Sequence, residues 1–155
     1  MITDAIILNG DSADCPQLIP LVETTHNNGF TMDEISADKA YSSRDNLDCI
    51  DKVGAVPYIP FKVNATAKPK GSIMWKKMYH YFQLNQEEFL THYHSRPNVE
   101  STFMVVKFKL GDCIKSKNFI AQVNEVYCKR IAYNITVLIS AMYELKVEPN
   151  LLAIN

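Results

Sequence analysis

Residues 93–107 read Tyr93-His-Ser-Arg96-Pro-Asn-Val-Glu100-Ser-Thr-Phe-Met-Val-Val-Lys107 in a chain of 155 residues. Glu100 and Lys107 are seven residues apart, which is two turns of an α-helix, so both side chains project from one face. Such a face can hold a metal ion and a phosphate. Pro97 disfavours helix at Arg96 and is well placed as the first residue of a new helix. We therefore expect a kink or break between two helices here.

The helix that carries Glu100 is expected to run from Pro97 to about Leu110, where Gly111 ends it. Val99, Phe103 and Val106 recur in it at helical spacing. This apolar stripe predicts that the helix packs on the core and that Glu100 lies near the edge of the buried face. A partly buried carboxylate there would need a partner.

The rest of the chain predicts an α/β protein. Strands are expected at residues 2–8, 32–37 and 56–61. Asp38 follows the second of these, at the end where functional residues of α/β sheets usually lie. Helices are expected over residues 14–27, from Ser42 or Ser43 to Gly54, over 73–95, and over 119–145. The last helix is apolar on most sides near residues 131–142, which predicts burial by several neighbours. Residues 62–72 should form an exposed basic loop.

Composition and charge fit a single domain with a divided surface. Apolar residues make up 47% of the chain, which is ample for a buried core. Residues 1–60 carry ten acidic against three basic residues, and residues 61–155 carry seven against thirteen, so the halves have charges of about −7 and +6. This division fits an acidic metal site beside a basic phosphate-binding surface. Ordinary solvated faces explain it equally well.

The sequence favours a cytoplasmic protein. The four cysteines have no Cys-x-x-Cys spacing, and nothing at the amino terminus is typical of a signal peptide. The most apolar stretch, residues 131–142, is too short to cross a bilayer. We therefore expect reduced thiols and no membrane segment.

The pattern Tyr-x2-Arg-x3-Glu-x6-Lys in residues 93–107 resembles the signature of the DDE-type insertion-sequence transposases, in the subgroup named for these four residues. The resemblance covers nearly the whole chain. It continues in Ser36-Ala-Asp38-Lys-Ala-Tyr41-Ser-Ser-Arg44, in Ala55-Val-Pro-Tyr-Ile-Pro60, and in Ala121-Gln-Val-Asn124-Glu125 followed by Asn134.

The resemblance implies a ribonuclease H-like fold with a helical carboxyl-terminal part. In that fold the first strand carries the first catalytic Asp, and residues 2–8 match the strand that follows it. We therefore expect residues 1–155 to form a partial catalytic domain that is truncated at its amino end and lacks the first strand.

The resemblance makes Asp38 and Glu100 the second and third catalytic acids, which would hold a two-metal site of Mg²⁺ or Mn²⁺. Without the motif, Asp38 would be interpreted as a cap of the following turn and Glu100 as a solvated helix residue. Asp4, Asp11 and Asp14 do not match the position of the missing first acid. The metal site is therefore expected to be incomplete in this chain.

DNA contacts are also implied by the resemblance. Tyr93, Arg96 and Lys107 would bind phosphates at the transposon end, although Arg96 could instead pair with Glu100 and Lys107 could form surface ion pairs. Trp75 would stack on an extruded base or belong to the core. Lys115 and Lys117 would follow the DNA backbone or be ordinary solvated residues.

The function implied is DNA transposition, with metal-dependent cleavage at the transposon ends and strand transfer into target DNA. We expect a homo-oligomer on DNA, and little or no activity from the isolated chain. One alternative is a catalytically dead remnant that binds DNA or dimerises and so modulates full-length transposase. Another is a stand-alone ribonuclease H-like nuclease, which would require an acid such as Asp4 to complete the site.

Overall fold

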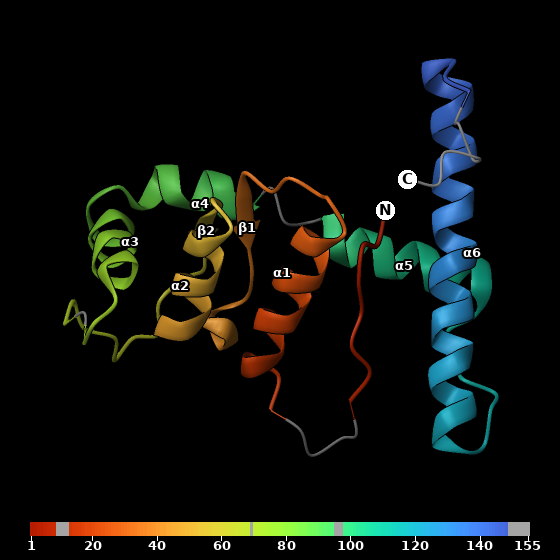
Figure 1. Ribbon diagram of the computed structural model, residues 1–155, viewed down its shortest axis with the longest axis horizontal. Helices are drawn as coiled ribbons and strands as arrows, with labels where there is room; N and C mark the ends of the chain where they lie inside the picture. Colours follow the sequence, from red (N-terminus) through yellow and green to blue (C-terminus); the bar gives the residue numbers. More distant parts are fainter. Residues whose placement is uncertain (9–12, 69, 95–97, 149–155) are drawn as a thin grey trace. The chain divides into compact units, whose positions relative to one another are not determined.

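The computed structural model describes residues 1–8, 13–68, 70–94 and 98–148. The chain divides into two compact units (Figure 1). The first comprises residues 4–100, and the second joins residues 1–3 to the chain from Ser101 onward. The described residues are rich in helix and contain a small parallel sheet in the first unit.

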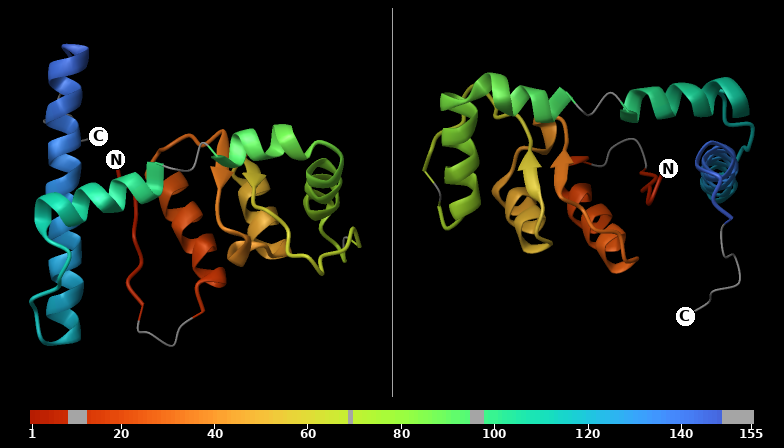
Figure 2. Two further views of the ribbon diagram at one scale, coloured as in Figure 1. Left: turned by 180° about the vertical axis from the view of Figure 1, so that it is seen from behind. Right: turned by 90° about the horizontal axis from the view of Figure 1, so that it is seen from above.

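The sheet consists of β1 (Glu34–Ser36) and β2 (Val56–Tyr58), with Glu34 opposite Val56 and Ser36 opposite Tyr58. Parallel strands require a crossover connection, which here contains α2 (Arg44–Lys52). Both strands point toward the helix α4, described below (Figure 2, right). The second and third predicted strands are therefore confirmed, although each is shorter than expected.

The strand predicted over residues 2–8 is wrong, because residues 1–8 belong to no helix or strand. The Asn134 side chain pairs with Ile2 instead: Nδ2 donates to the Ile2 carbonyl and the Ile2 N–H donates to Oδ1, both at 2.8 Å. A strand requires such pairing along a backbone ladder. The apolar pattern of this segment therefore does not suffice to make it a strand.

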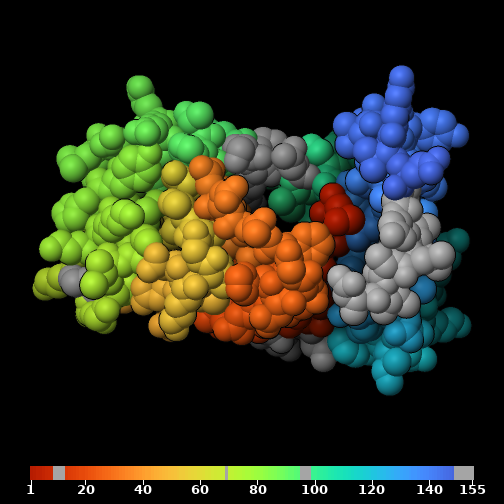
Figure 3. Space-filling view, turned by 45° about the horizontal axis from the view of Figure 1, so that its top comes forward, coloured from red at the N-terminus to blue at the C-terminus, as the bar shows by residue number. Residues whose placement is uncertain are grey.

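Two predicted helices of the first unit are confirmed at their termini. The helix α1 (Leu18–Asn27) follows a 3₁₀ turn over Cys15–Gln17, with Pro16 at its start. The α2 helix begins after Ser43, whose Oγ accepts the Asn46 N–H at 3.2 Å. Gly54 follows α2 with a φ of 82°, the left-handed conformation that favours glycine. The two helices lie side by side (Figure 3).

The helix predicted over residues 73–95 is two helices, α3 (Ile73–Leu84) and α4 (Gln86–His94). They are separated by Asn85, whose φ of −127° and ψ of 48° are not helical. The change of direction brings Phe89 into the core, where it is 0% exposed. Its ring lies 5.0 Å from Phe82 and 5.3 Å from Tyr58, measured between centroids.

Asn46 joins two turns of the first unit. It is 1% exposed, and its Nδ2 donates to the Cys15 carbonyl at 2.9 Å and to the Tyr41 carbonyl at 2.8 Å. Tyr41 ends the 3₁₀ turn Lys39–Tyr41, which directly follows Asp38. A buried amide therefore holds the backbone after Asp38 against the turn before α1.

The second unit contains α6 (Phe119–Leu145) and most of α5 (Asn98–Leu110), with the bounds that the sequence predicts. The predicted burial is wrong. No described residue of α5 or α6 is buried, and Val99 and Phe103 are 49% and 57% exposed. An apolar stripe is buried only where neighbouring elements cover it, and the described part of this unit contains no helix besides α5 and α6. None of the described helices combines the length and apolar character needed to span a membrane.

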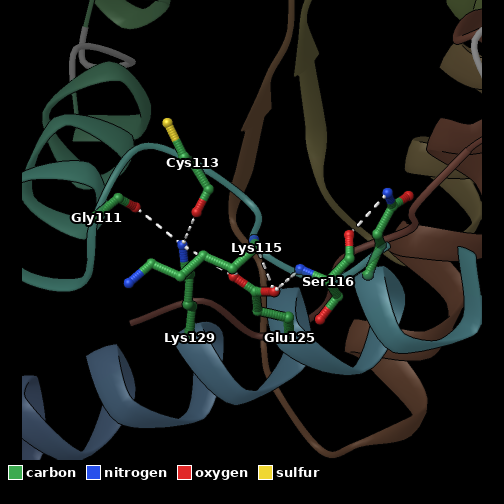
Figure 4. Close-up of polar contacts among 7 residues, drawn as sticks. Gly111, Cys113, Lys115, Ser116, Glu125 and Lys129 are labelled. Atoms are coloured by element: carbon green, nitrogen blue, oxygen red, sulfur yellow. Dashed lines mark hydrogen bonds and ion pairs between the residues drawn. The ribbon is translucent and has the colours of Figure 1, made fainter. Parts of the chain in front are cut away.

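The loop between α5 and α6 is held by two side chains of α6 (Figure 4). The Glu125 carboxylate accepts the N–H groups of Lys115 and Ser116 at 2.9–3.0 Å. Lys129 Nζ donates to the carbonyls of Gly111 and Cys113 at 3.0 and 2.9 Å. The two side chains also form an ion pair of 3.7 Å one helical turn apart.

Replacement of Asn46 tests the role of its amide. The Asn46→Ala variant leaves two carbonyls without their donor, and we expect the free energy of unfolding to fall by about 1–3 kcal/mol. Urea denaturation followed by the fluorescence of Trp75, the single tryptophan, measures this change. Asp51→Ala, at an exposed position of α2, should change it by less than about 0.5 kcal/mol. Equal midpoints for the two variants would contradict this role.

The Glu125 loop should loosen in acid. Hydrogen bonds from the Lys115 and Ser116 backbone lower the pKa of Glu125 from 4.5 to about 2. The stabilisation is therefore present above about pH 4.5 and is lost as the pH falls toward 2. Protection factors of the Lys115 and Ser116 amides, measured by hydrogen exchange, should fall across this range.

The Ala121 amide supplies an internal control for that experiment. It donates to the Asn118 side-chain oxygen at 2.8 Å, and that amide group does not titrate. Its protection should stay constant over the same range. Equal losses of protection at Ala121, Lys115 and Ser116 would indicate general unfolding and refute a local role of Glu125.

Candidate functional site

Asp38 lies two residues after the end of β1 and is exposed. Its backbone is extended, with φ −62° and ψ 154°, and the next residues form the turn Lys39–Tyr41. The backbone carbonyl of Asp38 accepts the Tyr41 N–H at 2.9 Å, but the side chain makes no capping hydrogen bond. The carboxylate is therefore not used as the cap of this turn.

Tyr93, in the last turn of α4, donates its hydroxyl to Asp38 Oδ1 at 3.3 Å. The two residues are 55 positions apart, and each comes from a different stretch of the predicted signature. The fold therefore brings together one residue from each stretch. A hydrogen bond to one carboxylate oxygen orients the group at the end of the sheet.

The neighbouring His92 attaches the same turn of α4 to both strands. Its ring stacks on Tyr58, with centroids 4.4 Å apart and planes 8° from parallel. Its Nδ1 lies 2.9 Å from the Glu34 carboxylate, and its backbone carbonyl accepts the Ser36 hydroxyl at 3.4 Å. Burial, and secondarily the Glu34 charge, raises the pKa of Tyr58 above its ordinary value.

The contacts of His92 were not predicted from the sequence. Its partners Glu34 and Tyr58 are separated from it by 58 and 34 positions, and no spacing rule connects them. The sequence feature that could have drawn attention to His92 is its position beside Tyr93, in the last turn of the predicted helix.

Glu100 and Lys107 both lie in α5 and both are exposed. Seven residues of helix place them about 10 Å apart along its axis. The two charges therefore share one helix as the spacing predicts. Arg96 and Pro97, with the predicted break between helices, lie outside the described residues.

Trp75 is a core residue in this structure, 6% exposed. Its ring meets Phe61 edge-on at 4.8 Å, and its Nε1 donates to the Thr66 carbonyl at 2.8 Å. The Arg44 guanidinium lies over the indole, 4.6 Å from the ring centroid. Stacking on an extruded base would require Arg44 to move away from the ring.

The remaining predicted DNA contacts belong to the second unit. Lys115 and Lys117 are exposed in the loop that Glu125 holds. The ammonium groups are therefore carried by a loop of defined backbone conformation.

A metal site of three ligands is not assembled among the described residues, which contain no cluster of three His, Cys, Asp or Glu side chains suited to an ion. The individual donors nevertheless suit a hard divalent cation, because Asp38 and Glu100 offer exposed carboxylate oxygens. His92 is engaged with Glu34 instead.

Comparison with known families identifies the chain. A family model described as a transposase DDE domain matches residues 1–135. No curated protein and no solved structure matches the chain. Because the match covers most of the sequence and includes both stretches that carry Asp38 and Glu100, the chain belongs to the transposase DDE domain family.

Proposed function

We propose that this chain contributes two carboxylates, Asp38 and Glu100, to the metal site of a DNA transposase of the Tyr-Arg-Glu-Lys subgroup with a ribonuclease H-like fold. Membership of the family makes DNA the substrate class and a divalent metal the general cofactor. The observation that carries the proposal is the hydrogen bond between Tyr93 and Asp38 at the end of the parallel sheet.

The reaction is cleavage of DNA at the transposon ends, followed by transfer of the freed 3′ end into target DNA. Phosphoryl transfer of this kind requires positioning and the neutralisation of charge, which bound Mg²⁺ or Mn²⁺ would supply. Asp38 and Glu100 would hold the metal through their carboxylate oxygens. Tyr93 is a positioning residue, since its hydroxyl orients Asp38.

Phosphates of the transposon end would be bound by Lys107, as a point charge on the Glu100 helix, and by Arg96, whose planar guanidinium can make two parallel hydrogen bonds. Lys115 and Lys117 would extend this surface along the DNA backbone. Base stacking by Trp75 stays a secondary proposal, since Arg44 lies over its ring. The protomers would act in pairs on DNA.

A second candidate is a DNA-binding or dimerising protein without catalysis, which modulates a complete transposase. This candidate is favoured by the number of acidic residues that match the motif. Asp38 and Glu100 match it, whereas the chemistry of the family uses three carboxylates. Such a protein would need its basic residues and would be indifferent to the loss of Asp38.

Metal binding separates the two candidates. In the full chain mixed with a DNA duplex, Asp38→Asn and Glu100→Gln should each weaken Mn²⁺ binding by at least about tenfold, measured by calorimetry, because each removes a ligand oxygen. Tyr93→Phe should have a smaller effect because it changes orientation alone. Asp51→Asn removes an exposed carboxylate elsewhere and should leave binding unchanged. Equal Mn²⁺ affinities for wild type and Asp38→Asn would refute the metal site.

Catalysis by the isolated chain should be weak. With two matched acids, the site should hold its metals loosely, and we expect little Mg²⁺-dependent cleavage of a supercoiled plasmid. Robust cleavage that disappears in Glu100→Ala would contradict this expectation. DNA binding that is identical with and without Mg²⁺, and unaffected by Asp38→Ala, would favour the protein without catalysis.

A further inference from the structure

A pocket of about 290 Å³ lies in the first unit, where residues near the amino ends of α2 and α3 meet the loop before α3. Three cationic residues line it: Arg44, Lys62 and Lys70. Asn64 and Thr66 add polar groups, and no acidic residue is among the described residues that line it. The described lining residues therefore carry three positive charges and no negative charge.

Arg44 occupies a fixed place in this pocket. Its guanidinium lies 4.6 Å from the centroid of the Trp75 ring, and its Nη2 donates to the Lys68 carbonyl at 3.2 Å. A guanidinium that lies over an indole ring keeps the N–H donors at its edge available, so that they can form hydrogen bonds with a planar or tetrahedral anion. Lys62 and Lys70 are exposed and add two flexible ammonium groups.

Two further features favour an anion. Arg44 is the first residue of α2 and Trp75 the third of α3, so both helices direct the positive ends of their dipoles toward this region. Ser42 also lines the pocket, and its buried Oγ has no hydrogen-bond partner among the described residues. If an anion were bound in the pocket, a small rotation of the Ser42 side chain would allow its hydroxyl to donate a hydrogen bond to an oxygen of that anion.

We propose that this pocket binds a phosphodiester group of DNA, through Arg44, Lys62 and Lys70. The inference rests on the DNA substrate of the proposed function but not on its metal site, and it involves none of Tyr93, Arg96, Glu100 and Lys107. Ser42, which lines the pocket, is four residues after Asp38. A DNA strand bound in the pocket would therefore be held by the same unit that carries the Asp38 carboxylate.

Trp75 provides a direct probe, because it is the single tryptophan of the chain and lines the pocket. The full chain is titrated in EDTA with a mixed-sequence 20-base-pair duplex while Trp75 emission is followed at several salt concentrations. We expect a saturable change in emission. The slope of log K against log salt should fall in magnitude by about one in Lys62→Gln and by about two in the double variant with Lys70→Gln.

Lys52→Gln is the matched control, since it removes an exposed charge at the far end of α2. Its salt slope should equal that of the wild type. The proposal is overturned if the double variant binds DNA with the wild-type slope, if bound DNA leaves Trp75 emission unchanged, or if polyglutamate or inorganic phosphate gives the same saturable response as DNA. Because Lys62 and Lys70 are exposed, the urea midpoints of the variants should match that of the wild type.

Failure of this proposal and failure of the metal site are distinguishable. The titration contains no metal, so a loss of slope in the double variant would stand even if Asp38→Asn left Mn²⁺ binding unchanged. Conversely, if the double variant binds DNA with the wild-type salt slope, the pocket does not bind DNA, and the proposed metal site is unaffected by that result.

Discussion

The hydrogen bond between Tyr93 and Asp38 depends on the burial of Phe89. An exposed hydrogen bond of 3.3 Å contributes about 0.5–1.5 kcal/mol at most, which is too little to position a helix. Phe89, one turn earlier in α4, is fully buried against Tyr58 and Phe82, and removal of such a side chain typically costs about 3–5 kcal/mol. The aromatic core therefore positions α4, and the polar contacts of its last turn follow from that placement.

His92 connects this core to the strands. Its ring stacks on Tyr58, the last residue of β2, and its Nδ1 pairs with Glu34, the first residue of β1, so His92 contacts both strands of the sheet. The chain changes direction at Asn85, and α4 then packs on β2, where Phe89 contacts Tyr58 as well as Phe82. The setting of Asp38 is thus a product of packing as much as of local sequence.

Local sequence signals predicted the helices well and the tertiary features poorly. Ser43 and Gly54 mark the two ends of α2, and Gly111 marks the end of α5, as capping chemistry requires. The strand at residues 2–8 and the buried stripe of α5 failed for one reason: both depend on a partner that a periodic pattern does not supply. The pairing of Tyr93 with Asp38 joins two stretches that resemble the family. His92 lies outside these stretches, and Arg44, although it ends one of them, carried no sequence signal of a pocket.

Two residues within the stretches that resemble the family have structural roles here. Glu125 binds backbone N–H groups of the loop before α6, and Asn134 binds the backbone of Ile2. A family motif therefore contains residues whose role is to hold the backbone. Asp38 differs from these two residues, because it is exposed and its carboxylate accepts the Tyr93 hydroxyl instead of capping the turn that follows it.

The most direct test of the account is to locate a bound cation. Crystals of the full chain with a DNA duplex and Mn²⁺ would be examined for the anomalous signal of manganese. The account predicts a peak within coordination distance of carboxylate oxygens of both Asp38 and Glu100. A manganese peak bound elsewhere, with these two carboxylates on separate faces of the protein, would contradict it.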